Sequence, residues 1–287
     1  MRIIGVAAGA LLATALLQAC STMRLAYDQS PQLAYWWLDG YVDFDSNQSR
    51  QVREDLDALQ QWHRSSELPQ IDALLRQAQD AAPREITADS ACRLLDGVRE
   101  RLQAVTLRAE DVVAVSALSL QPEQIDNIRR KFERNNAKYR KLWLDATPED
   151  WRARRLKEVR ERSEMLYGRL SPAQREALQE HIARSAFDPQ RRYAEMLLRQ
   201  QDLLQTLAQL SQDKPPPEQA RATVRALFER ALNPPDADQR RHQQALQREG
   251  CEAFAQVHAL ATPAQRQTAV ERLQDYRRDL RRLEAAR

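Results

Sequence analysis

Apolar residues recur at intervals of three and four positions along most of the chain after residue 46. In 47–66, for example, Val52, Leu56, Leu59 and Trp62 fall on one face of a helix, with charged residues between them. Such a pattern is typical of helices that bury one stripe. It predicts about ten helices, at 47–66, 69–82, 87–107, 122–145, 148–167, 172–187, 189–212, 218–232, 236–260 and 263–287.

Several of these helices begin with a similar short motif. "LSPAQREAL" and "LATPAQRQTAV" each place a Ser or Thr before Pro and follow it with Gln. Ser171 and Thr262 are therefore expected to cap their helices, with Gln174 and Gln265 reaching back to complete a capping box. The spacing of these starts along the chain is irregular, so no regular solenoid is predicted. Short Pro-capped links predict antiparallel neighbours.

Composition supports an all-α class. Only six glycines occur in 287 residues, and Asp-Gly pairs do not lie between alternating apolar segments. Helix formers dominate, and β-branched residues are sparse. We therefore predict an antiparallel helical bundle or array over 46–287, with the "DKPPP" stretch at 213–217 as the best candidate for a hinge.

The start of the chain has a different character. An apolar run over 3–17 is shorter than the ~20 residues that span a bilayer, and it ends at Leu17-Gln18-Ala19-Cys20. This stretch resembles the lipobox of bacterial lipoproteins. The alternatives are an ordinary cleavable signal with a chance cysteine and an uncleaved membrane helix, which the short run disfavours.

The lipobox resemblance implies several properties. Residues 1–19 would be a removed signal peptide, and Cys20 would carry a diacylglycerol and an N-acyl chain, the only added groups expected. Ser21 in place of Asp implies sorting to the outer membrane rather than retention in the inner membrane, with the protein facing the periplasm. Residues 20–45 would be a lipid-anchored tether and aromatic segment.

Two cysteines remain, Cys92 and Cys251. An oxidising compartment favours their pairing, which would close a loop of about 160 residues for an ideal gain of about 4–5 kcal/mol. The alternative is two buried free thiols that pack as small apolar groups.

Charge is unevenly distributed, although the net charge is only +3. Residues 28–80 are acidic, whereas 128–169 are basic. The simpler interpretation is solvated helix faces with ion pairs such as Glu158–Arg162. The other is a basic surface for acidic polypeptides or anionic lipids. A periplasmic address argues against nucleic acid as a partner.

Motifs for catalysis or metal binding are not found in the sequence. His63, His181, His242 and His258 are isolated, and neither HExxH, CxxC, GxSxG nor a phosphate loop occurs. We expect His63 to partner a carboxylate or carbonyl at a helix end. The sequence thus predicts neither an enzyme nor a metal site nor a bound cofactor.

One dense cluster combines acids and aromatics: Trp36, Trp37, Asp39, Tyr41, Asp43, Phe44 and Asp45. The favoured interpretation is an aromatic anchor that packs on the bundle, with Asp45 or Ser46 capping the next helix. A second places the Trp pair at the membrane interface. A third is a glycan site with paired carboxylates.

Two resemblances bear on function. The segments "YWWLDGYVDF" and "WHRSSELP" resemble an uncharacterised family of Gram-negative bacterial lipoproteins. "LSPAQ" and "ATPAQ" also resemble the LTxxQ motif of periplasmic helical chaperones and stress sensors, which hold unfolded clients on a concave, partly basic surface.

We therefore expect a non-catalytic structural or interaction protein of the cell envelope, anchored to the membrane and contacting envelope proteins. The alternative is an LTxxQ-like chaperone or stress sensor that binds unfolded polypeptides. A chaperone predicts a concave apolar and basic groove along 130–141 and 152–162, whereas a scaffold predicts flat, ion-paired faces there.

Overall fold

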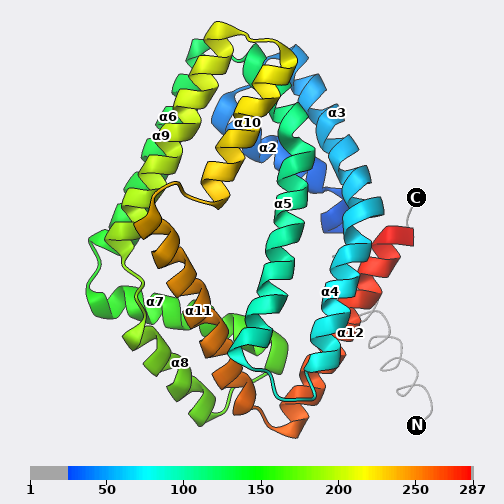
Figure 1. Cartoon of the computed structure of the whole chain (residues 1–287), viewed down its shortest axis with the longest axis vertical. Coiled ribbons are helices and arrows are strands. Elements are labelled where there is room, and N and C mark those ends of the chain that lie inside the picture. Colours follow the sequence, from blue (N-terminus) through cyan, green and yellow to red (C-terminus); the bar gives the residue numbers. More distant parts are fainter. Residues whose placement is uncertain (1–24, 286–287) are drawn as a thin grey trace, which may run out of the picture.

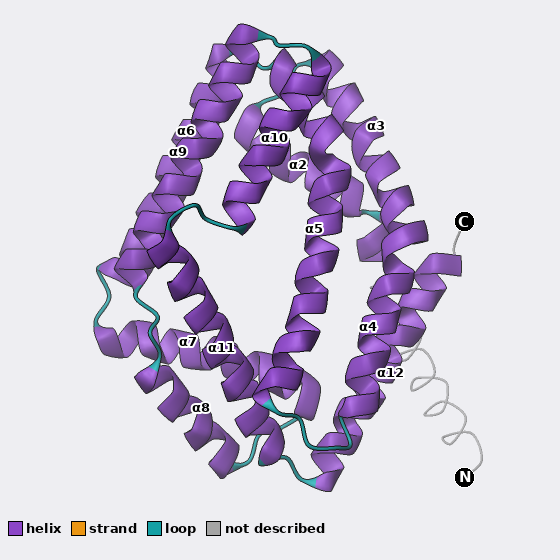
Figure 2. Cartoon of the chain, in the orientation of Figure 1, coloured by secondary structure: helices purple, strands orange, loops and turns teal. Residues whose placement is uncertain are grey.

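A computed structural model describes residues 25–285, and within them the chain consists of helices joined by short turns and loops, with no strand. The predicted all-α class is confirmed (Figures 1 and 2). The α-helices are α2 Ser30–Val42, α3 Ser46–Trp62, α4 Leu68–Ala81, α5 Ala88–Ser119, α6 Pro122–Tyr139, α7 Pro148–Tyr167, α8 Pro172–Arg184, α9 Pro189–Asp213, α10 Pro217–Leu232, α11 Ala237–Ala259 and α12 Pro263–Ala285. Two π-helical turns, His63–Glu67 and Arg140–Leu144, follow α3 and α6.

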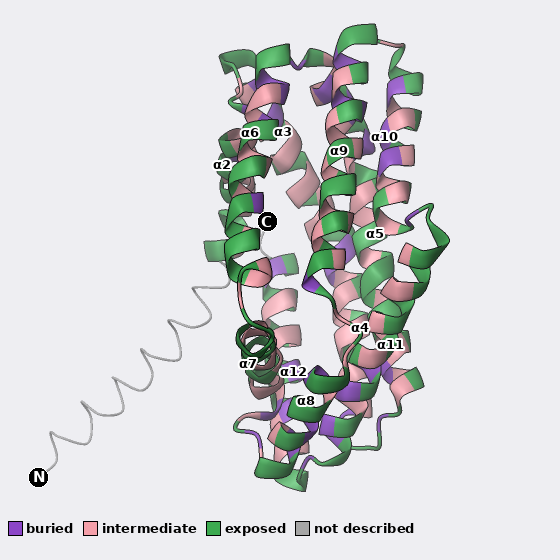
Figure 3. Cartoon of the chain, turned by 90° about the vertical axis from the view of Figure 1, so that its left-hand side faces the viewer, coloured by how far each residue is buried: buried purple, intermediate pink, exposed green. Residues whose placement is uncertain are grey.

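Buried apolar residues form two main clusters, which define two modules. In the upper module, α2, α6, α9, α10 and the end of α5 enclose a core that includes Ile128, Leu210 and Val224. In the lower module, α4, α7, α8, α11 and α12 enclose a core that includes Leu178 and Val257. The helices that the sequence predicts bury the apolar residues of their three- and four-residue pattern in these cores. Figure 3 shows the upper module in two layers, with α2, α3 and α6 on one side and α5, α9 and α10 on the other.

Long helices connect the modules (Figure 1). The 32-residue α5 contacts α4 and α11 in the lower module and α9 and α10 in the upper one. The second connection is α3, the first π turn and α4, which follow one another without a loop. The chain also passes between modules after α6, after α8 and after α10.

Helix starts in the lower module confirm the predicted capping boxes. The Ser171 hydroxyl accepts from the Gln174 N–H at 3.2 Å, and the Gln174 side chain accepts from the Ser171 N–H at 2.9 Å. Thr262 and Gln265 repeat this arrangement. In addition, Gln265 Nε2 donates to Gln174 Oε1 at 2.9 Å, so the two boxes join the start of α8 to the start of α12.

The sequence prediction is wrong at the end of α5 and at the junction between α3 and α4. Helix α5 continues from the expected end at 107 to Ser119, because small buried residues such as Ala114 and Ala117 extend its stripe without a breaker. No loop separates 66 from 69. Pro69 lacks the N–H that would bond one turn back, and the chain widens into a π turn in which the Leu68 N–H bonds to the His63 carbonyl.

The sequence pattern does not predict helix α2, because residues 20–45 are expected to form a tether and aromatic segment. Its sequence is apolar on nearly every face, so it shows no three- and four-residue period. The helix begins with Pro31 in its first turn and ends at Asp43, which has a left-handed φ of 62°. It packs on α3 and α6 and contributes Val42 to the upper core.

The segment expected as a hinge, 213–217, links α9 to α10. Both helices belong to the upper core, through Leu210 and Val224 among others. Lys214, with φ of 41°, ends α9 in the left-handed conformation, and the following prolines lead directly into α10. The segment is thus a turn within one module.

Candidate functional site: a pocket in the lower module

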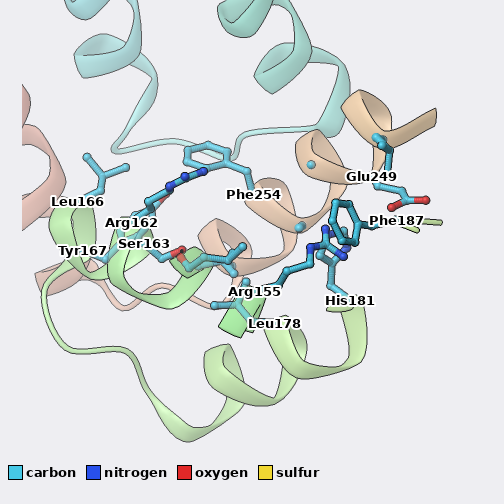
Figure 4. Close-up of a pocket in the computed structure, with 15 residues that line it drawn as sticks. Arg155, Arg162, Ser163, Leu166, Tyr167, Leu178, His181, Phe187, Glu249 and Phe254 are labelled. Carbon is cyan, nitrogen blue, oxygen red and sulfur yellow. Dashed lines mark hydrogen bonds between the residues drawn. The ribbon is translucent and has the colours of Figure 1, made fainter. Parts of the chain in front are cut away.

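A pocket of about 340 Å³ opens between α7, α8 and α11. Its walls are mainly aliphatic and aromatic, and they include Val159, Leu166, Leu178, Leu246 and Phe254. Figure 4 shows Leu166 and Tyr167 at one end of the pocket, and Arg155, His181 and Phe187 gathered at the other. This size and lining are typical of sites that bind a small apolar group.

Arg155 is the most unusual polar residue of this pocket. Its guanidinium carbon lies 4.1 Å from the centroid of the Phe187 ring. Its Nη1 is buried and has no hydrogen-bond partner within the described residues. Burial lowers the pKa of Arg155, and the negative charge of Glu249 opposes this only in part. The pocket therefore holds a cation with an unused donor, which suits an anionic or carbonyl oxygen.

The carboxylate of Glu249 is held by the loop that follows α8. It accepts from the Ser185 hydroxyl at 2.8 Å and from the Ala186 N–H at 3.0 Å. Burial lowers the pKa of His181, so its imidazole is neutral at pH 7. Arg162 also lines the α7 side, whereas the Ser163 hydroxyl donates to the Val159 carbonyl at 2.9 Å.

Beneath the pocket, a buried chain of hydrogen bonds fixes Tyr167. His258 Nε2 lies 2.7 Å from the Arg84 carbonyl, which only accepts, so Nε2 carries the proton. The Nδ1 of His258 then accepts from the Tyr167 hydroxyl at 2.8 Å. Burial lowers the pKa of His258 and raises that of Tyr167, which keeps both side chains neutral. No sequence motif points to this chain of bonds, since the two rings lie 91 positions apart.

Cys92 and Cys251 form a disulfide with a Cα–Cα distance of 5.4 Å. The bond joins the start of α5 to α11 and lies in a small cluster with Ile86 and Ala91. Gly250 and Ala253, on either side of Cys251, line the pocket. The disulfide thus holds one wall of the pocket against α5. Cys20, the expected lipidation site, lies outside the described residues.

His63 is the histidine for which the sequence predicts a specific partner. Its Nδ1 lies 3.0 Å from the Tyr27 hydroxyl, not from a carboxylate or carbonyl as expected. His63 opens the π turn that also contains Glu67, whose buried carboxylate pairs with Arg101 at 3.6 Å. The "WHRSSELP" stretch therefore forms the joint between α3 and α4. No group of metal-binding side chains is present among residues 25–285.

The aromatic and acidic cluster around 36–45 divides into two parts. Asp45 caps α3, as expected, and Asp39 accepts from the Phe44 N–H at 3.0 Å. Tyr41 and Phe44 pack on the upper core. The packing interpretation is wrong for Trp36 and Trp37, which are 60% and 64% exposed.

The basic residues of the segment 128–169 differ in their surroundings. On α7, Lys157 and Arg160 form i,i+4 ion pairs with acids, as a scaffold predicts. Arg155 and Arg162 line the pocket instead, as a chaperone predicts. The predicted continuous groove along 130–141 and 152–162 is thus reduced to one pocket at α7, while Arg140 donates to the Tyr193 hydroxyl at 2.6 Å.

The described residues define a disulfide-linked, all-helical protein of two modules, with an amphipathic pocket between α7, α8 and α11. None of its described helices is both long and apolar enough to cross a membrane. A family model matches residues 40–231, about two thirds of the chain, and the chain belongs to this family of unknown function (DUF6279). Membership of an uncharacterised family agrees with the sequence resemblance. Neither a curated protein nor a solved structure matches the chain.

Proposed function

We propose that this protein is a non-catalytic interaction protein of the cell envelope. In this proposal, Cys20 carries the diacylglycerol and the N-acyl chain, and the helical modules face the periplasm from the outer membrane. The lipobox-like sequence before Cys20 supports the anchor. The Cys92–Cys251 disulfide independently supports the periplasmic location, because structural disulfides persist in oxidising compartments.

The observation that carries an interaction role is the combination of interlocked helices and ion-paired outer faces. Capping-box side chains join α8 to α12, and the disulfide joins α5 to α11. On the outer face of α7, Lys157 pairs with Glu161 and Arg160 pairs with Glu164. Such a body presents a fixed surface to an envelope partner.

The anchor is tested with a Cys20→Ser variant. We expect the wild-type protein to stay in the outer-membrane fraction and to show an acyl mass on an N-terminal Cys20 peptide. The variant should leave that fraction. If the variant stays there, or if the wild-type peptide carries no acyl mass, the proposed anchor is wrong.

A second candidate function is the holding of unfolded polypeptides, and the α7–α8–α11 pocket favours it. The pocket combines apolar walls with the unpartnered Nη1 of Arg155, which matches an apolar side chain next to a peptide carbonyl or carboxylate. The pocket is small, so it would hold one or two side chains of a client rather than a long segment.

Suppression of aggregation by a chain that begins at Ser21 tests this second function, because that chain keeps every described residue. We expect it to slow aggregation of a denatured client at stoichiometric amounts. A Phe187→Ala variant should lose this effect, while the matched control Arg160→Ala, on the ion-paired face of α7, should keep it. Equal activity of both variants, or no suppression by the unaltered chain, removes the chaperone function.

A further inference from the structure

Helix α2 exposes an apolar stripe to its surroundings. Leu33, Trp36 and Trp37 are 51%, 60% and 64% exposed, and Leu25 just before the helix is 62% exposed. Trp36 and Trp37 each lie three or four residues from Leu33 and from exposed Gly40, and Leu25 lies eight residues, about two turns, before Leu33, so these positions share one face. Backbone bonds from the Gln29 N–H to the Leu25 carbonyl and from the Leu33 N–H to the Gln29 carbonyl continue the helical path through residues 25–33.

The stripe is unusual because its helix has almost no charge. Asp39 is the only charged residue of α2, and its carboxylate accepts from the Phe44 N–H at the end of the helix. The opposite face of α2 is also apolar, and Tyr35 and Val42 are buried there. A helix that faces water normally carries polar residues on its outer side. Two adjacent, exposed tryptophans on an uncharged helix mark a surface with a partner.

Cations flank the helix on both of its packed sides. The guanidinium of Arg53, on α3, lies 3.5 Å from the centroid of the Tyr35 ring. The Lys131 Nζ, on α6, lies 5.3 Å from the centroid of the Tyr41 ring, and it also lies beside Gly40. Tryptophan between basic residues is the composition that anchors proteins at the level of lipid headgroups.

The position of the stripe points to the same partner. Leu25 is five residues after Cys20, so an extended link between them reaches at most ~17 Å. Figure 3 shows α2 at the edge of the molecule, on the side away from α9 and α10. A short link from a lipidated cysteine therefore keeps this face of α2 close to the bilayer surface.

We infer that the Leu25–Leu33–Trp36–Trp37 face of α2 inserts into the interfacial layer of the bilayer, with Arg53 and Lys131 close to anionic headgroups. This inference rests on the proposed lipid at Cys20. It adds a second contact that orients the modules: α2 lies along the membrane surface, and α9 and α10 face away from it. Burial of these apolar side chains would add to the attachment that the acyl chains of Cys20 provide.

The test uses the mature lipidated protein in vesicles of phosphatidylethanolamine and phosphatidylglycerol that contain a lipid brominated near the top of one acyl chain. One variant, Trp62→Phe/Trp143→Phe/Trp151→Phe, keeps only the α2 tryptophans. The matched variant, Trp36→Phe/Trp37→Phe, keeps the other three. We expect bromine to reduce the emission of the first variant at least twofold and to leave that of the second nearly unchanged.

The outcomes separate the two proposals. If the protein carries no acyl mass and does not bind vesicles, the proposed anchor fails. If it is anchored but bromine quenches neither variant, α2 does not face lipid and the inference is overturned. Dimers in detergent, combined with absent quenching, would assign the stripe to a second copy of the chain. Should the triple variant lose its helical circular dichroism, the difference in quenching between wild type and Trp36→Phe/Trp37→Phe gives the same answer.

Discussion

Gln48 and Gln124 lie 76 positions apart in the chain and donate to each other's side-chain oxygens, at 3.1 and 2.6 Å. Each is also the third helical residue (N3) in a capping box, in which Asp45 and Gln121 respectively are the N-cap residues. The pair therefore joins the start of α3 to the start of α6 in the upper module. In the lower module, the bond from Gln265 Nε2 to Gln174 Oε1 likewise joins the start of α12 to the start of α8.

This relationship makes Gln124 a stability determinant. It accepts from the Gln121 N–H at 2.9 Å and donates to the Asp43 carbonyl at 3.0 Å, in addition to its bonds with Gln48. A Gln124→Ala variant leaves these buried groups without partners, and we expect a loss of about 2–4 kcal/mol in the free energy of unfolding. Urea denaturation measures it. The control is Gln256→Ala, at an exposed position of α11, which should change stability by less than about 0.5 kcal/mol.

Reduction of the disulfide should destabilise the chain by loosening α11 from α5. Cys92 and Cys251 close a loop with a separation of 159 positions, and removal of such a bond typically costs about 2–5 kcal/mol. Thermal unfolding with and without a phosphine reductant measures the effect. The Cys92→Ser/Cys251→Ser variant should match the reduced wild type and should not respond to the reductant. A wild type whose midpoint is insensitive to reductant would contradict this expectation.

Features encoded by local sequence were the ones that could be predicted. The apolar period of each helix and the caps at Ser171 and Thr262 depend on residues within one turn. Helix α2 could not be recognised, because an apolar residue on its outer face looks the same in sequence as one on its inner face. The pocket could not be predicted either, since Arg155, Phe187 and Glu249 come from separate segments and share no motif.

Acid should destabilise the protein, because burial lowers the pKa of one buried and two half-buried histidines. Burial lowers the pKa of His63, His181 and His258, each below its value in the unfolded chain. The unfolded state then binds more protons than the folded state below about pH 6.5, so the stability present at neutral pH is lost as the pH falls. We expect the thermal midpoint to decrease steadily from pH 7 to pH 5.

His258 offers the sharpest test of this pH dependence, since it is fully buried between Tyr167 and the Arg84 carbonyl. A His258→Leu variant leaves both partners without a bond and should be about 1–3 kcal/mol less stable at pH 7. Its thermal midpoint should, however, depend less on pH than that of the wild type between pH 7 and pH 5. An unchanged pH profile would mean that His258 does not control acid sensitivity.

Substitution of Arg155 can distinguish a binding role of the pocket from a role in packing alone. Its buried Nη1 has no partner within residues 25–285, and burial lowers its pKa, so the free protein holds this cation in an unfavourable environment. An Arg155→Met variant keeps the apolar contact with Phe187 and removes the charge. We therefore expect its free energy of unfolding to stay equal or to rise by up to ~1 kcal/mol, while suppression of client aggregation decreases.

The control variant Arg160→Met, in the ion-paired face of α7, should change neither quantity. If Arg155→Met instead lowers stability as much as Gln124→Ala does, the guanidinium supports the fold, and the pocket is a consequence of packing rather than a binding site.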